Sequence, residues 1–156
     1  MGDLEVRIIR LEPQRVAATY GFGASPEPLA WDQMIAFVRE KGLDQQGKTP
    51  RYFGFNNPNP APGSPNYGYE QWVTVDAGVE GTQDAKIKEF SGGLFAVTRT
   101  TLRTIGEDWQ KLVLWSEASQ YRIANQQCLE EMLTPPGSPG EINEDMQLDL
   151  YLPVVG

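Results

Sequence analysis

Short runs of apolar and β-branched residues, separated by turn residues, dominate the hydrophobic pattern of this chain. The first run covers residues 6–11 and resumes at 15–20, and Pro13 between them predicts a bend within one long extended stretch. Six further runs have the length and composition of strands. They cover residues 51–56, 67–75, 86–90, 94–98, 127–134 and 146–154.

Two segments carry the 3.6-residue spacing of a helix instead. In the first, Trp31, Met34, Ile35 and Val38 fall on one face, and Gly42 predicts the C-terminal stop.

The second helix is expected to begin at Thr104, where Thr104 and Glu107 have the spacing of a capping box. Its inner stripe comprises Ile105, Trp109, Leu112, Val113 and Ser116.

The order strand, helix, strand, turn-rich loop, strand occurs twice, over approximately residues 5–76 and 84–154. The loops at 57–66 and 135–140 are rich in Pro, Gly and Asn or Ser. A shift of about 79 residues superposes the halves; it places Ile8 on Ile87, Ala17 on Ala96, Phe53 on Met132, Glu70 on Asp149 and Trp72 on Tyr151.

This repeat predicts a single α+β domain over residues 1–156, built from two pseudo-symmetric βαββ units. We expect one antiparallel sheet with both helices on one face and a concave ligand groove on the other. A central cleft between two halves is a common place for a ligand.

The composition of the chain argues against several classes of function. The net charge of −8 argues against direct nucleic-acid binding, and no apolar run is long enough to span a membrane, so we expect a cytoplasmic protein. The chain has one cysteine and no histidine, which excludes an internal disulfide and a Cys–His pair. We expect no metal and no cofactor, and acid–base chemistry would rest on carboxylates, Tyr, Lys or water.

Several segments together resemble the GyrI-like family, the effector-binding domains attached to AraC- and MerR-type regulators and also found alone. The resemblance covers essentially the whole chain, and it is carried by residues 6–21, 67–75, 93–97, 109–115, 129–135 and 148–154. The family commonly shows an aromatic-Glu-x-Tyr-Leu sequence. Here Leu129 and Met132 replace the two aromatic residues, while Glu130 keeps the acid.

The resemblance implies a stand-alone sensor or sequestering protein that holds a small, lipophilic, often aromatic or cationic compound in a central groove beside a buried glutamate. One alternative is a small hydrolase of strained, cyclopropane-type electrophiles that uses Glu130, with Tyr69 helping to position water. Another is a protein-interaction inhibitor module, in the style of gyrase-inhibiting relatives. A protein partner or a homodimer is compatible with each of these functions.

Glu130 is the strongest candidate for the site. If Leu129 and Leu133 pack under the helices, strand alternation directs Glu130 into the groove, together with Met132. The opposite register makes Glu131 the groove residue. A carboxylate among aromatic rings attracts a cationic ligand through charge and cation–π contacts.

The other candidate ligand-binding residues are mostly aromatic. Each could also be an ordinary core residue of the sheet, but a ring in a groove can stack on a ligand. They are Phe53, Phe55, Tyr67, Tyr69, Trp115, Met132 and Tyr151.

Overall fold

The computed structural model of the protein describes residues 4–57, 59–133 and 143–156. These residues form two helices and nine strands, and the strand pairs described below are all antiparallel, which confirms the predicted α+β class. In chain order the elements are β1 (Arg7–Leu11), β2 (Gln14–Gly23), α1 (Pro26–Lys41), β3 (Tyr52–Asn56), β4 (Tyr67–Thr74), β5 (Lys86–Phe90), β6 (Gly93–Thr101), α2 (Ile105–Glu117), β7 (Arg122–Ile123), β8 (Leu129–Met132) and β9 (Gln147–Val155).

The chain divides into two compact units. The α1 unit comprises the described residues from 14 to 90 and holds β2, α1, β3, β4 and β5. The α2 unit comprises residues 4–13, 91–133 and 143–156 and holds β1, β6, α2, β7, β8 and β9. Neither described helix has the length and apolar character that crossing a bilayer requires.

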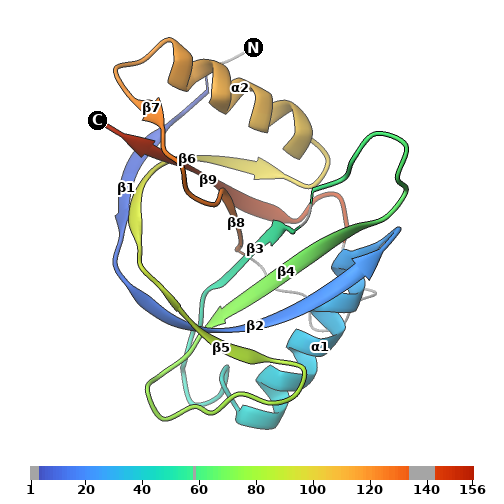
Figure 1. Ribbon diagram of the computed structural model, residues 1–156. Helices are drawn as coiled ribbons and strands as arrows, with labels where there is room; N and C mark the ends of the chain where they lie inside the picture. Colours follow the sequence, from blue (N-terminus) through green and yellow to red (C-terminus); the bar gives the residue numbers. More distant parts are fainter. Residues whose placement is uncertain (1–3, 58, 134–142) are drawn as a thin grey trace. The chain divides into compact units, whose positions relative to one another are not determined.

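In the α1 unit the strands lie in the order β3-β4-β2-β5, and helix α1 packs along β2 and β4 (Figure 1). Trp31, Met34 and Val38 are buried as expected, and Gly42 ends the helix with a φ of 63°. The Thr19 hydroxyl donates to the backbone oxygen of Ala30 at 2.8 Å, so Thr19 points towards the helix.

Directly paired residues on antiparallel strands share a face. Thr19 pairs with Gln71, and Gly54 on β3 pairs with Gln71 in turn. The neighbouring pair of Ala18 and Trp72 therefore points away from α1. We call this side of the strands the helix-free face of the α1 unit.

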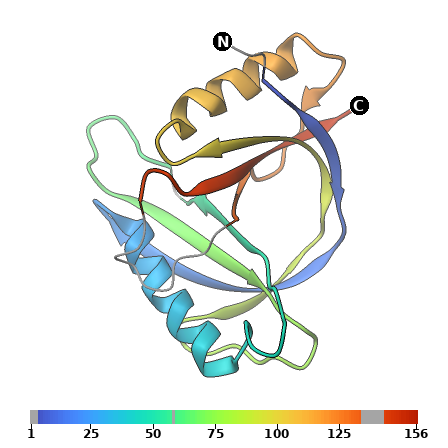
Figure 2. The same cartoon turned by 180° about the vertical axis from the view of Figure 1, so that it is seen from behind.

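In the α2 unit the strands lie in the order β1-β6-β9-β8, and β7 pairs with the end of β9. Helix α2 covers β6 and β9, as both views show (Figure 2). The core between α2 and these strands is an aliphatic cluster of Ala96, Leu112, Leu150, Leu152 and Val154. The opposite side of these strands is the helix-free face of the α2 unit.

The capping box predicted at Thr104 is wrong, although α2 does begin at the next residue. The Thr104 side chain caps no backbone N–H of the helix; its hydroxyl donates to the Asp108 carboxylate at 3.1 Å. Asp108 also accepts from the Thr100 hydroxyl at 2.6 Å. The Thr104 hydroxyl is therefore oriented towards the Asp108 carboxylate and not towards a backbone N–H of the first turn.

The two units repeat each other's pairing but not the boundaries of the sequence repeat. Strand β1 pairs with β6, and β5, its counterpart at a shift of 79 residues, pairs with β2. The pair Arg7 and Val97 thus corresponds to Lys86 and Ala18 (7 + 79 = 86; 97 − 79 = 18). Each compact unit therefore takes its edge strand from the other half of the sequence.

The sequence alignment of Phe53 with Met132 is wrong. Phe53 pairs with Trp72, whose repeat counterpart is Tyr151. Tyr151 pairs with Leu129, so Leu129 and not Met132 occupies the position equivalent to Phe53. Strand β8 is also shorter than the predicted run, and the second turn-rich loop at 135–140 lies outside the described residues.

Candidate functional site

Strand β8 decides which of two adjacent glutamates points away from α2. Leu129 pairs with Tyr151, and Glu130 pairs with Leu150, which belongs to the core under α2. Leu129 therefore does not pack under the helix, and the premise that directed Glu130 away from it is wrong. The opposite register applies: Glu131, which pairs with Asp149, lies on the helix-free face.

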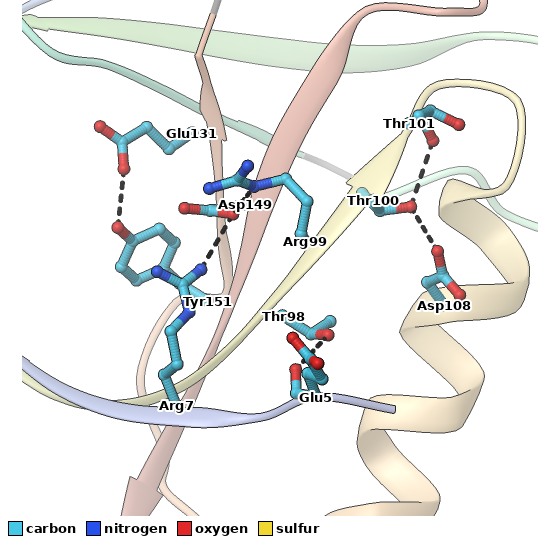
Figure 3. Close-up of polar contacts among 10 residues, drawn as sticks. All are labelled: Glu5, Arg7, Thr98, Arg99, Thr100, Thr101, Asp108, Glu131, Asp149 and Tyr151. Atoms are coloured by element: carbon cyan, nitrogen blue, oxygen red, sulfur yellow. Dashed lines mark hydrogen bonds and ion pairs between the residues drawn. The ribbon is translucent and has the colours of Figure 1, made fainter. Parts of the chain in front are cut away.

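Glu131 and Tyr151 form a buried pair on that face. The Tyr151 hydroxyl donates to Oε1 of Glu131 at 2.6 Å, and both residues are less than 10% exposed, at 2% and 7% respectively (Figure 3). The Phe95 ring meets the Tyr151 ring edge-on at 5.7 Å between centroids. Glu131, Tyr151 and Phe95 thus bring together a carboxylate, a phenol and a second aromatic ring, the types of side chain that we expect in the groove.

Asp149, next along the same face, is also buried and lies between two arginines. Its Oδ1 accepts from Nε of Arg99 at 2.6 Å, and a terminal nitrogen of Arg7 lies 3.0 Å away (Figure 3). The hydrogen bond to Asp149, together with the nearby negative charges of Asp149 and Glu131, raises the pKa of Arg99. Both arginine side chains are about half exposed, at 52% for Arg99 and 48% for Arg7.

The helix-free face of the α1 unit carries an aromatic cluster. Trp72 lies at its centre, with Phe55 edge-on at 5.1 Å and Phe90 at 5.4 Å between ring centroids. Phe53 pairs with Trp72 and lies beneath the Arg51 guanidinium, 5.0 Å from ring centroid to Cζ. The structure therefore groups two of the predicted aromatic residues, Phe53 and Phe55, with Trp72.

A third buried carboxylate, Glu70, lies on the same face of the α1 unit. Its Oε2 accepts from Nε1 of Trp72 at 2.6 Å and from Nζ of Lys88 at 2.7 Å. Its Oε1 lies 3.4 Å from Nδ2 of Asn57. Glu70 is the repeat counterpart of Asp149. The alignment of the two halves in the sequence therefore already paired these two buried carboxylates.

The remaining predicted residues lie on the helix side. The Tyr67 hydroxyl donates to Glu27 of α1 at 2.6 Å, and Tyr69 shares the face of Gln71 and Thr19. Trp115 stacks on Tyr121 beside the core under α2. Met132 lies on the same face of β8 as Glu130.

Cys128 packs partly buried against the core under α2. Burial, and after it the nearby charge of Glu130, raises the pKa of the thiol. A raised pKa leaves little thiolate at neutral pH, which makes this cysteine a poor nucleophile.

The GyrI-like family model, described as a small molecule binding domain, matches residues 4–155. No curated protein sequence matches the chain. Solved structures share the fold at low identity. A hydrolase encoded by lin2189 from Listeria innocua has a TM-score of 0.71 and 13% identity, and the match covers 98% of this chain and 93% of that one.

Two further structures are similar. The C-terminal domain of EcmrR has a TM-score of 0.68 and 10% identity, with 97% of this chain and 98% of that chain covered. SAV2435 bound to tetraphenylphosphonium has a TM-score of 0.57 and 13% identity, with 98% and 95% covered. At these identities the matches show a shared fold.

Proposed function

Because the chain belongs to the GyrI-like small molecule binding domain family, we propose that it binds lipophilic organic cations, with the Glu131 carboxylate as the charged contact. The observation that carries the proposal is the buried hydrogen bond between Tyr151 and Glu131 on the helix-free face of the α2 unit. Binding of this kind would serve sensing or sequestration of the compound.

The chemistry of the pair favours a cation. Tyr151 is a neutral donor, so its hydrogen bond orients Glu131 while leaving a negative charge on the carboxylate. The rings of Tyr151 and Phe95 offer π-faces beside it, and cation–π attraction strengthens when water is excluded. Arg99 bonds through Nε to Asp149, and the nearby charge of Glu131 also contributes to the raised pKa of Arg99.

The comparisons give independent support. SAV2435, which shares the fold, has been solved with tetraphenylphosphonium, itself a lipophilic cation with aromatic rings. EcmrR, a second similar structure, was solved in a complex with DNA. A ligand-binding domain linked to regulation is therefore the function that we infer for this chain.

The test is a calorimetric titration of the protein with tetraphenylphosphonium, followed in parallel by tryptophan fluorescence. Glu131→Gln should weaken binding about tenfold or more, which corresponds to about 1.4 kcal/mol. Glu130→Gln is the matched control, because it removes the same charge one residue away on the opposite face of β8, and should change the affinity less than about twofold.

Neutral triphenylphosphine oxide, added as a ligand control, should bind more weakly than the cation and respond little to Glu131→Gln. Equal effects of the two glutamate substitutions would contradict the assignment of Glu131. A stronger effect at Glu130 would restore the residue that the sequence analysis favoured.

The same pair supports hydrolysis as a second function, and the Listeria innocua neighbour is described as a hydrolase. Glu131 would accept a proton from a water molecule that attacks a carbon of a strained ring. The ring bond breaks, and the released atom takes up that proton from Glu131, which restores the carboxylate. Turnover of an epoxide probe that is lost in Glu131→Gln and kept in Glu130→Gln supports this function. Absence of turnover in the unaltered protein rules it out for that class of substrate.

A further inference from the structure

A cavity with a volume of about 280 Å³, open to solvent, lies on the α1 unit, on the helix-free side of β4, β2 and β5. Its size is close to the lower end of small-molecule sites. The residues that line it are Ala18, Thr19, Tyr20, Asn57, Glu70, Lys86 and Lys88.

One wall of the cavity is held in place by Tyr20. Its hydroxyl donates to the backbone oxygen of Asn57 at 2.7 Å, so the side chain reaches from β2 across β4. Gly68 makes this possible, because a Cβ at that position would overlap both the Tyr20 hydroxyl and the Asn57 oxygen. The glycine keeps open the space that the tyrosine spans.

The negative charge in the wall is already compensated. Glu70 is buried, and its Oε2 accepts two short hydrogen bonds, from Trp72 and from Lys88. A carboxylate with these partners has little capacity left for a ligand cation. Glu70 therefore serves to hold Lys88 in position at the cavity.

More cationic than anionic side chains line the cavity. Lys86 and Lys88 are two residues apart on β5 and share a face, and both line the cavity. Lys88 uses one of its N–H groups on Glu70, and the Lys86 ammonium has no hydrogen bond or ion pair within residues 4–57, 59–133 and 143–156. The lining thus has two cations and one carboxylate, in a chain whose net charge is −8.

We propose that this cavity binds a small aromatic carboxylate. The two ammonium groups contact the carboxylate of the ligand, and the half-exposed Tyr20 ring provides an aromatic surface at the rim. This site takes a ligand of the opposite charge to the one proposed at Glu131, so it is a second binding function of the chain.

The experiment is an NMR titration of the full chain with benzoate, observed at the backbone amides of Ala18, Tyr20 and Lys86. Saturable shifts at these amides in the low-millimolar range are expected. Benzamide, the neutral isostere, should shift them far less. Lys86→Gln should weaken benzoate binding about threefold to fivefold, the range for one solvent-accessible charge contact.

Lys111→Gln is the matched control, since it removes the same charge from the α2 unit, outside the cavity lining. It should leave benzoate binding unchanged. The proposal is overturned by an absence of saturable shifts at the three amides, by equal binding of benzamide, or by equal effects of the two lysine substitutions. Equal binding of inorganic phosphate would reduce the site to a non-selective anion contact and overturn the aromatic ligand.

Tetraphenylphosphonium distinguishes this proposal from the first. Lys86→Gln should leave its affinity unchanged, whereas Glu131→Gln should weaken it and leave benzoate binding intact. A loss of both ligands in Lys86→Gln would contradict two separate functions, and unchanged thermal unfolding of this variant confirms that the comparison is between folded proteins.

Discussion

The Tyr151 hydroxyl and the Glu131 carboxylate meet diagonally across two paired strands, 2.6 Å apart, with Leu129 directly opposite the tyrosine. Diagonal neighbours on one face of a sheet are within reach of long side chains. The bond therefore depends on the register between β8 and β9, and a shift by one residue would replace Glu131 with Glu130.

Tyr151→Phe should lower the free energy of unfolding by about 1–3 kcal/mol, because it leaves a buried charged acceptor without this donor. Urea denaturation measures the change. Tyr121→Phe is the control, since the Tyr121 ring stacks on Trp115 and the ring is kept; its effect should stay within about 0.5 kcal/mol. Equal effects would show that the bond to Glu131 contributes nothing specific.

The arginines around Asp149 should show non-additive effects. Arg99→Gln removes the shorter contact and should lower the free energy of unfolding by about 1–2 kcal/mol. The effect is no larger because solvent screens this half-exposed side chain. Arg7→Gln alone should cost less than about 1 kcal/mol.

The double substitution should exceed the sum of the two by about 1 kcal/mol, because only then does the buried Asp149 lose both cations. A double-mutant cycle by urea denaturation measures this difference. Strict additivity would mean that the two arginines act independently.

Tyr52 should make the stability depend on pH in the alkaline range. Burial, and after it the charge of Asp44, raises the pKa of Tyr52 from 10.0 to about 12 in the folded protein. The folded state then holds the proton more tightly than the unfolded state, so this contribution is complete below pH 10 and is lost as the pH rises towards about 12.

Tyr52→Phe removes that dependence. Between pH 10 and 12, the free energy of unfolding should fall with pH less steeply in the variant, by about 1 kcal/mol per pH unit at most. Urea denaturation at a series of pH values compares the two slopes, so that other titrating groups cancel. Parallel slopes would show that Tyr52 titrates at its ordinary pKa.

Substitution by alanine should have opposite effects on stability at two glycines. Gly106→Ala, within the first turn of α2, adds a Cβ with nothing within 4 Å and should stabilise the protein by about 0.5 kcal/mol through helix propensity. Gly54→Ala adds a Cβ that overlaps Tyr69 and lies 2.9 Å from Oε1 of Gln71, and should destabilise by about 2 kcal/mol or more. Thermal unfolding of both variants gives the signs.

The local elements could be predicted from the sequence because each depends on neighbouring residues. The apolar face at Trp31, Met34 and Val38 and the stop at Gly42 fix α1 without tertiary information. The two-residue strand β7 could not be predicted, since it is defined only by its pairing with β9.

The sequence could predict which types of side chain form the candidate site, but not which residues lie on the face where it is found. The missing histidine and lone cysteine restrict acid–base chemistry to carboxylates, Tyr, Lys or water, and the match of Glu70 with Asp149 already marked two buried acids. Face assignment failed at Glu130 because alternation gives two possible registers, and which one is adopted depends on the partner strand.

The sequence by itself therefore determined the α+β class, the C-terminal end of α1, the start of α2 and the types of side chain available for binding. Only the tertiary structure decided that Glu131 faces away from α2 and that β1 pairs with β6 while β5 pairs with β2. It also brought Lys86 and Lys88 to the cavity beside Tyr20. The physical reason is that strand pairing joins residues distant in the chain through backbone hydrogen bonds, which are the same for every side chain and leave the register to long-range packing.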